Sequence, residues 1–88
     1  MKISDKFVLR QVAGEWIVLP VAEKTVNFNG MLTLNETGVM LWKLLQQGST
    51  REELAQALTD EYDVMFEEAL ADVDEYLSKL EGAGCLEQ

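Results

Sequence analysis

The side chains that could carry out chemistry in this chain are almost all carboxylates. The sequence has 16 Asp and Glu residues, one cysteine and no histidine. Histidine is the commonest general base and metal ligand, and one thiol without imidazole cannot build a zinc site within one chain. No glycine-rich phosphate-binding motif is present. This inventory predicts a protein that is not an enzyme on its own and that has no metal and no cofactor.

Two groups of carboxylates come closest to a metal or acid–base site. The acidic run at residues 60–63 lacks the ligand spacing and the turn glycine of a calcium loop. It is therefore interpreted as a solvated loop. Asp72, Asp74 and Glu75 fall within a helical pattern, where they predict a solvent-facing helix surface.

Size and charge limit the classes of partner. The 88 residues allow a single domain, residues 1–88, with one small core. A net charge of −9 repels nucleic acid and an anionic membrane surface, and it favours a basic or polar partner. No apolar run is long enough to span a bilayer, and the N-terminus lacks the apolar core of a signal peptide. Cys85 is the only cysteine, so no internal disulfide can form, which suits a reducing, cytoplasmic location. Cys85 itself is expected to be a packing residue.

The elements that must position these side chains begin with strands. Phe7–Val12 and Glu15–Pro20 are typical of β-strands, and Ala13-Gly14 between them predicts a tight hairpin. Met31–Leu34 predicts another strand. Thr25–Phe28 also alternates, so the intervening Asn29-Gly30 is either a hairpin turn or a bulge in one longer strand.

Three helices are expected after the strands. Asn35 is a favoured N-cap for a helix from Glu36 to Gln46, with Gly48 as its C-terminal stop. A capping box, Thr50 with Glu53, opens the second helix, and an apolar stripe predicts the third over Glu67 to Glu81. Strands followed by helices indicate an α+β fold.

The ordered set of motifs resembles the PqqD family over nearly the whole chain. The residues that carry the resemblance are Phe7-Val8-Leu9-Arg10, Leu34-Asn35-Glu36-Thr37-Gly38, Trp42, Leu45, Gly48, Thr50, Glu52-Glu53-Leu54, Leu58, Glu61-Tyr62-Asp63-Val64, Asp72-Val73, Tyr76-Leu77, Leu80, Gly84 and Leu86.

The resemblance implies a winged-helix-like fold, with a three-stranded antiparallel sheet on three helices. It also implies a non-catalytic recognition element for ribosomally made precursor peptides, whose leader segment adds to the sheet edge beside the third helix. A partner enzyme, often a radical SAM protein, would then modify the peptide.

Strand addition requires an open edge and a groove for side chains. On this hypothesis, the backbones that bind the peptide are those of Met31, Leu32 and Thr33. The third helix would supply apolar pockets and a charged rim from Val73, Tyr76, Leu80, Asp72, Glu75 and Lys79. The plainer interpretation of Val73 is that it belongs to the core, and Asp72 could instead accept a structural hydrogen bond.

Two other functions are considered. A winged-helix DNA-binding protein needs a basic recognition helix, yet Glu53–Tyr62 has no basic residue and the third predicted helix has only Lys79. A structural subunit could instead pair its open strand edge with a second copy to form a homodimer.

Overall fold

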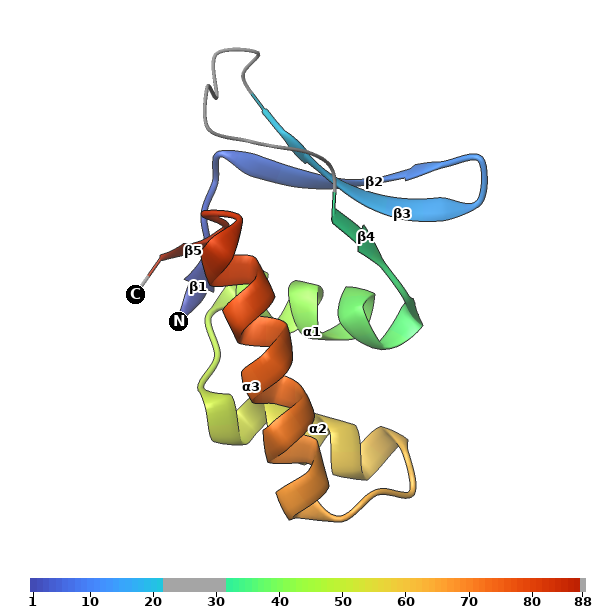
Figure 1. Ribbon diagram of the computed structural model, residues 1–88, viewed down its shortest axis with the longest axis vertical. Helices are drawn as coiled ribbons and strands as arrows, with labels where there is room; N and C mark the ends of the chain where they lie inside the picture. Colours follow the sequence, from blue (N-terminus) through green and yellow to red (C-terminus); the bar gives the residue numbers. More distant parts are fainter. Residues whose placement is uncertain (22–31, 88) are drawn as a thin grey trace.

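The computed structural model describes residues 1–21 and 32–87 and confirms the α+β order, a three-stranded antiparallel sheet followed by three helices (Figure 1). The sheet contains β2 (Phe7–Val12), β3 (Glu15–Pro20) and β4 (Leu32–Leu34) in the order β2-β3-β4. Both strand pairs are antiparallel. The likeness to a winged helix remains an expectation.

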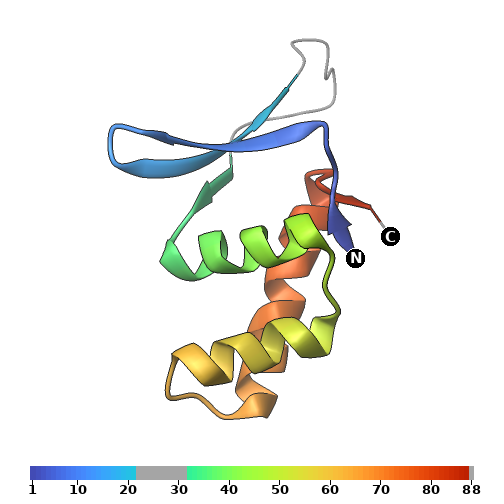
Figure 2. The same cartoon turned by 180° about the vertical axis from the view of Figure 1, so that it is seen from behind.

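The β2–β3 hairpin forms as the sequence predicts. Val12 pairs with Glu15, so the loop consists of Ala13 and Gly14 alone. Both loop residues have positive φ, 52° and 82°, which is the conformation that a two-residue type I′ turn requires. The hairpin extends beyond the helices to one side of the molecule (Figures 1 and 2).

The third strand is confirmed over Leu32–Leu34. Met31 lies outside the described residues, as do Thr25–Phe28 and Asn29-Gly30. The choice between a hairpin and a longer bulged strand therefore remains a prediction.

The helices are α1 (Glu36–Gln47), α2 (Arg51–Glu61) and α3 (Phe66–Gly82). The ends of α1 and α3 lie within one residue of their predicted limits. The Asn35 side chain accepts a hydrogen bond from the Gly38 N–H at 2.8 Å. Gly48, with φ 92°, ends α1. The capping box at the start of α2 has both of its reciprocal hydrogen bonds. Among the described helices, none is long and apolar enough to cross a membrane.

The sequence patterns miss a second, two-stranded sheet at the chain ends. It pairs β1 (Lys2–Ile3) with β5 (Leu86–Glu87), which brings the two ends of the chain side by side (Figure 1). The Ser4 N–H donates to the Cys85 carbonyl at 2.7 Å next to this pair. Strands of two residues show no periodicity, so the alternation of side chains could not reveal them.

One core joins the inner face of the sheet to all three helices. Its largest fully buried side chains are Trp42, Leu45, Leu54, Leu80, Val18, Val73 and Cys85. Arg51 at the start of α2 forms a double hydrogen bond with Asp74 of α3, the longer one 2.7 Å from Nη2 to Oδ2. This core and ion pair hold α3 against α2.

Candidate functional site

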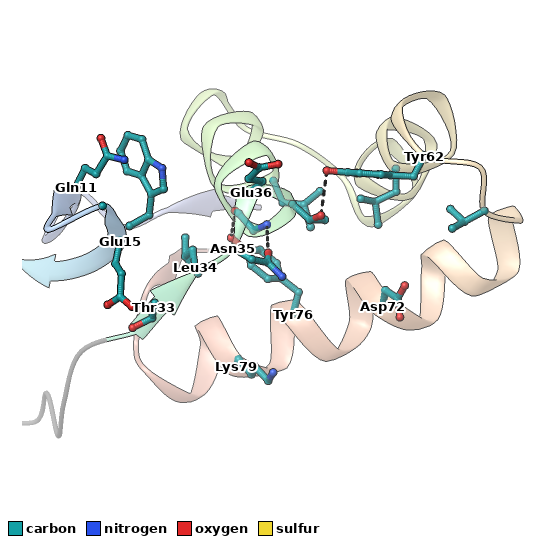
Figure 3. A pocket seen from close by; sticks show the side chains of 17 residues that line it. Gln11, Glu15, Thr33, Leu34, Asn35, Glu36, Tyr62, Asp72, Tyr76 and Lys79 are labelled. Atoms are coloured by element: carbon teal, nitrogen blue, oxygen red, sulfur yellow. Dashed lines mark hydrogen bonds between the residues drawn. The ribbon is translucent and has the colours of Figure 1, made fainter.

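An open pocket of about 1000 Å³ lies where β4, the start of α1 and one face of α3 meet (Figure 3). The end of the β2–β3 hairpin and the C-terminal end of α2 complete its lining. We call this cavity the β4–α3 pocket. Its lining comes from three segments that are apart in sequence, residues 11–16, 33–41 and 58–79, and so it depends on the tertiary fold.

The hairpin determines which backbone groups of β3 turn toward β4. In a two-residue hairpin the pair that closes the loop, here Val12 and Glu15, exchanges hydrogen bonds. Backbone groups alternate in direction along a strand, so Glu15 and Ile17 turn toward β2. Trp16 and Val18 therefore turn their N–H and C=O groups toward β4.

The same alternation continues into β4. Leu34 and Leu32 lie opposite Trp16 and Val18 and direct their backbone groups inward to β3. Thr33 lies between them, so its N–H and C=O point away from β3, toward the outer edge of the described sheet. Thr33 is exposed and lines the β4–α3 pocket. The Leu32 backbone groups therefore face β3, and the predicted contact of Leu32 with a peptide stays a prediction.

The α3 side of the pocket is formed by Asp72, Tyr76 and Lys79, all three predicted from the sequence (Figure 3). Their spacing of four and three residues places them on one helix face. Val73 and Leu80 are 0% and 1% exposed and belong to the core, so they do not supply pockets for a ligand. Both side chains pack in the core, which is the plainer interpretation given above for Val73.

Tyr76 joins α3 to the start of α1. Its hydroxyl donates to the Gly38 carbonyl at 2.7 Å. Burial raises the pKa of Tyr76 well above its usual value, so the hydroxyl remains protonated and keeps donating at neutral pH. The hydrogen bond fixes the angle between the two elements that flank the Thr33 edge.

Several lining residues were not assigned to the site from the sequence. Thr37 at the start of α1 donates through Oγ1 to the hydroxyl of Tyr62 at 3.0 Å, which links α1 to the end of α2 across the pocket. Trp16 and Glu36 also line it. Thr37, Glu36 and Tyr62 all belong to the motifs that carried the family resemblance, which was the signal that could have identified them.

The pocket offers binding surfaces of mixed character. Three carboxylates, those of Glu15, Glu36 and Asp72, line it together with the single ammonium of Lys79. Apolar side chains and the phenol of Tyr76 make up much of the rest. Within residues 1–21 and 32–87, no cluster of His, Cys, Asp and Glu is arranged to hold a metal ion. An open strand edge beside a mixed polar and apolar surface suits an extended chain.

The fold and this pocket define a small α+β domain in which the outermost strand of the described sheet and a helix line one pocket. The chain belongs to the PqqD family, since the family described as Coenzyme PQQ synthesis protein D (PqqD) matches residues 15–86. No curated protein matches it.

Two solved structures are similar to this chain over almost its whole length. One, titled TbiB1 in complex with the TbiA(beta) leader peptide, is 29% identical with a TM-score of 0.79, and the match covers 99% of this chain and 95% of that one. The other is lasso peptide synthetase B1 complexed with the leader peptide, 21% identical with a TM-score of 0.75 over 96% and 93%. The second comparison supports the fold alone.

Proposed function

We propose that this protein binds the leader segment of a ribosomally made precursor peptide and presents the peptide to a modifying enzyme. The observation that carries the proposal is the outer side of β4 at Thr33, which no strand of residues 1–21 or 32–87 pairs with and which lies next to α3 in the β4–α3 pocket. A peptide in extended conformation can add there as a fourth strand, because its N–H and C=O groups find partners on Thr33.

The comparisons support the same ligand class. The TbiB1 structure, at 29% identity, contains a leader peptide, and this chain shares its fold. The protein itself acts as a binding element without catalysis, and the modifying enzyme, a radical SAM protein or another peptide-modifying enzyme, performs the chemistry.

Binding divides into two parts. The edge of β4 supplies affinity that is independent of sequence, through main-chain hydrogen bonds. Tyr76 contributes an apolar ring surface to the pocket, and Asp72 and Lys79 place opposite charges along the same helix face. These side chains select among peptides, because β-strand ligands present alternate side chains to the surface beside them.

The proposal is tested by titrating the ¹⁵N-labelled protein with synthetic leader peptides. We expect amide shifts at Leu32–Leu34 and along the Asp72–Lys79 face, with amides of the β1–β5 sheet unchanged as an internal control. A scrambled peptide of the same composition controls for charge. If neither β4 nor α3 shifts with any leader, the proposed site is wrong.

The acidic surface argues against the DNA-binding alternative. From residue 51 to residue 88 the chain has 12 acidic residues against Arg51 and Lys79, a net charge of −10. Phosphate groups would be repelled from α2 and α3. Salt-dependent binding to duplex DNA would contradict the proposal.

A further inference from the structure

The turn between α2 and α3 lies at the end of the molecule farthest from the three-stranded sheet (Figures 1 and 2). Large apolar side chains are exposed there. Tyr62, Met65 and Phe66 are 38%, 67% and 40% exposed. They lie within five residues of each other, and we call them the turn patch. Aromatic residues and methionine are the types enriched at the centres of protein interfaces.

The N-terminus of α3 lacks a stabilising side-chain cap. Asn35 and Thr50 cap α1 and α2 through their side chains, whereas the N-cap of α3 is Met65, whose side chain makes no capping hydrogen bond. Its backbone angles, φ −74° and ψ 150°, would suit a serine. A methionine here adds nothing to the helix, and with 67% exposure little of it is packed.

The charges around the turn patch indicate the chemistry of what covers it. Residues 60–68 include five carboxylates and no basic residue, and all five carboxylates are exposed. A second copy of this chain would bring the same negative charge against it, which disfavours a symmetric contact. A partner with an apolar pocket and a Lys/Arg rim fits both the patch and its surroundings.

Tyr62 connects this surface to the peptide site. It belongs to the turn patch and also lines the β4–α3 pocket, where its hydroxyl accepts the hydrogen bond from Thr37. A protein seated on the turn patch is therefore next to whatever occupies the pocket.

We propose that the turn patch is the docking surface for the modifying enzyme, which covers Tyr62, Met65 and Phe66 with an apolar pocket bordered by basic side chains. This inference rests on the proposed function, since it names the second partner of the same domain. The peptide and the enzyme then occupy adjoining surfaces, and Tyr62 is shared between them.

The test uses Met65→Ser in the full chain. Serine at this N-cap should raise the Tm by roughly 4–8 °C, because a cap contributes about 1 kcal/mol in a domain of this size. The same variant should weaken binding to a purified radical SAM peptide-modifying enzyme with which the wild type forms a complex, by about tenfold or more. Loss of binding by a more stable protein cannot come from unfolding.

Val12→Ser is the matched control, because Val12 is 50% exposed but lies at the hairpin, away from the turn patch. Affinity for the enzyme is measured by biolayer interferometry in about 50 mM and 500 mM salt, and that of the wild type should weaken at high salt. Binding of Met65→Ser within twofold of wild type would overturn the inference. So would a wild-type dimer in light scattering that strengthens with salt and dissociates in Met65→Ser.

Leader binding is measured separately by fluorescence anisotropy with the labelled synthetic leader. If the leader binds wild type and Met65→Ser equally while the enzyme distinguishes them, the inference is supported. If the leader fails to bind the wild type, the proposed function fails, whatever the enzyme does.

Discussion

Replacement of Thr33 by proline tests strand addition at a single backbone N–H. Thr33 lies opposite Ile17, and its N–H points toward the free side of β4. Proline removes that donor and puts its ring in the path of an added strand, yet it leaves the hydrogen bonds between β3 and β4 intact. Proline is tolerated on an edge strand when its N–H side faces solvent.

The size of the effect follows from the hydrogen bond that is lost. A peptide carbonyl left without its donor in a covered site costs about 1–3 kcal/mol. At 1.4 kcal/mol per factor of ten, the Kd for the leader should rise by roughly 5-fold to 150-fold. The Tm should change little, because no hydrogen bond among the described residues is removed.

The assay is fluorescence anisotropy with a labelled leader peptide, with circular dichroism to verify folding. Thr33→Val is the matched control, since it keeps the N–H and the β-branched shape and loses only the hydroxyl. Its affinity should lie within about twofold of wild type, which corresponds to less than the energy of one hydrogen bond. Leu32→Pro, in contrast to Thr33→Pro, should lower the Tm, because the Leu32 N–H turns toward Val18 and its loss breaks a hydrogen bond of the sheet.

A folded Thr33→Pro protein that binds the leader as tightly as Thr33→Val would refute strand addition at β4. If Leu32→Pro, and not Thr33→Pro, abolished binding without loss of stability, the orientation of the strand would be wrong.

Three further predictions concern the framework of the site. Tyr76→Phe removes the hydrogen bond to the Gly38 carbonyl and should cost about 0.5–1.5 kcal/mol, seen as a lower Tm in thermal unfolding; an unchanged Tm would contradict its role. The hydrogen bond from Arg51 lowers the pKa of Asp74 below its ordinary value of 3.8. The pair therefore stabilises the fold fully above the ordinary pKa, and this stabilisation is lost as the pH falls through the lower pKa of the folded state. The Tm difference between wild type and Asp74→Asn should thus be constant near neutrality and shrink in acid, and a difference that grew in acid would contradict this. Burial raises the pKa of the Cys85 thiol from 9.0 to about 11, so Cys85 should react slowly with a thiol reagent at pH 8 until the protein is unfolded. The free energy of unfolding should fall as the pH rises from 9.0 to about 11, because the unfolded thiol loses its proton first.

The elements of the fold could be predicted where local chemistry decides them. Asn35 and Thr50 mark helix starts through their own side-chain hydrogen bonds, and Ala13-Gly14 marks a turn through its backbone conformation. These effects act over three or four residues, so the order of amino acids is enough. The β1–β5 pair was not predictable, because its strands are 83 residues or more apart in sequence and have no periodic signal.

The site was predictable only in part. Asp72, Tyr76 and Lys79 share a helix face by spacing alone, and the structure places all three on the β4–α3 pocket. The apolar stripe of the same helix could not show which members face the core. Packing of α3 against α2 and within the common core decided that Val73 and Leu80 are buried.

The sequence by itself determined that this is an acidic α+β domain without histidine, with three helices after a hairpin, and its motifs pointed to the PqqD family. Only the tertiary structure decided that Thr33, and not Leu32, faces the open edge. The reason is physical: the direction of a backbone N–H depends on the register with the neighbouring strand, and that register joins segments that are distant along the chain.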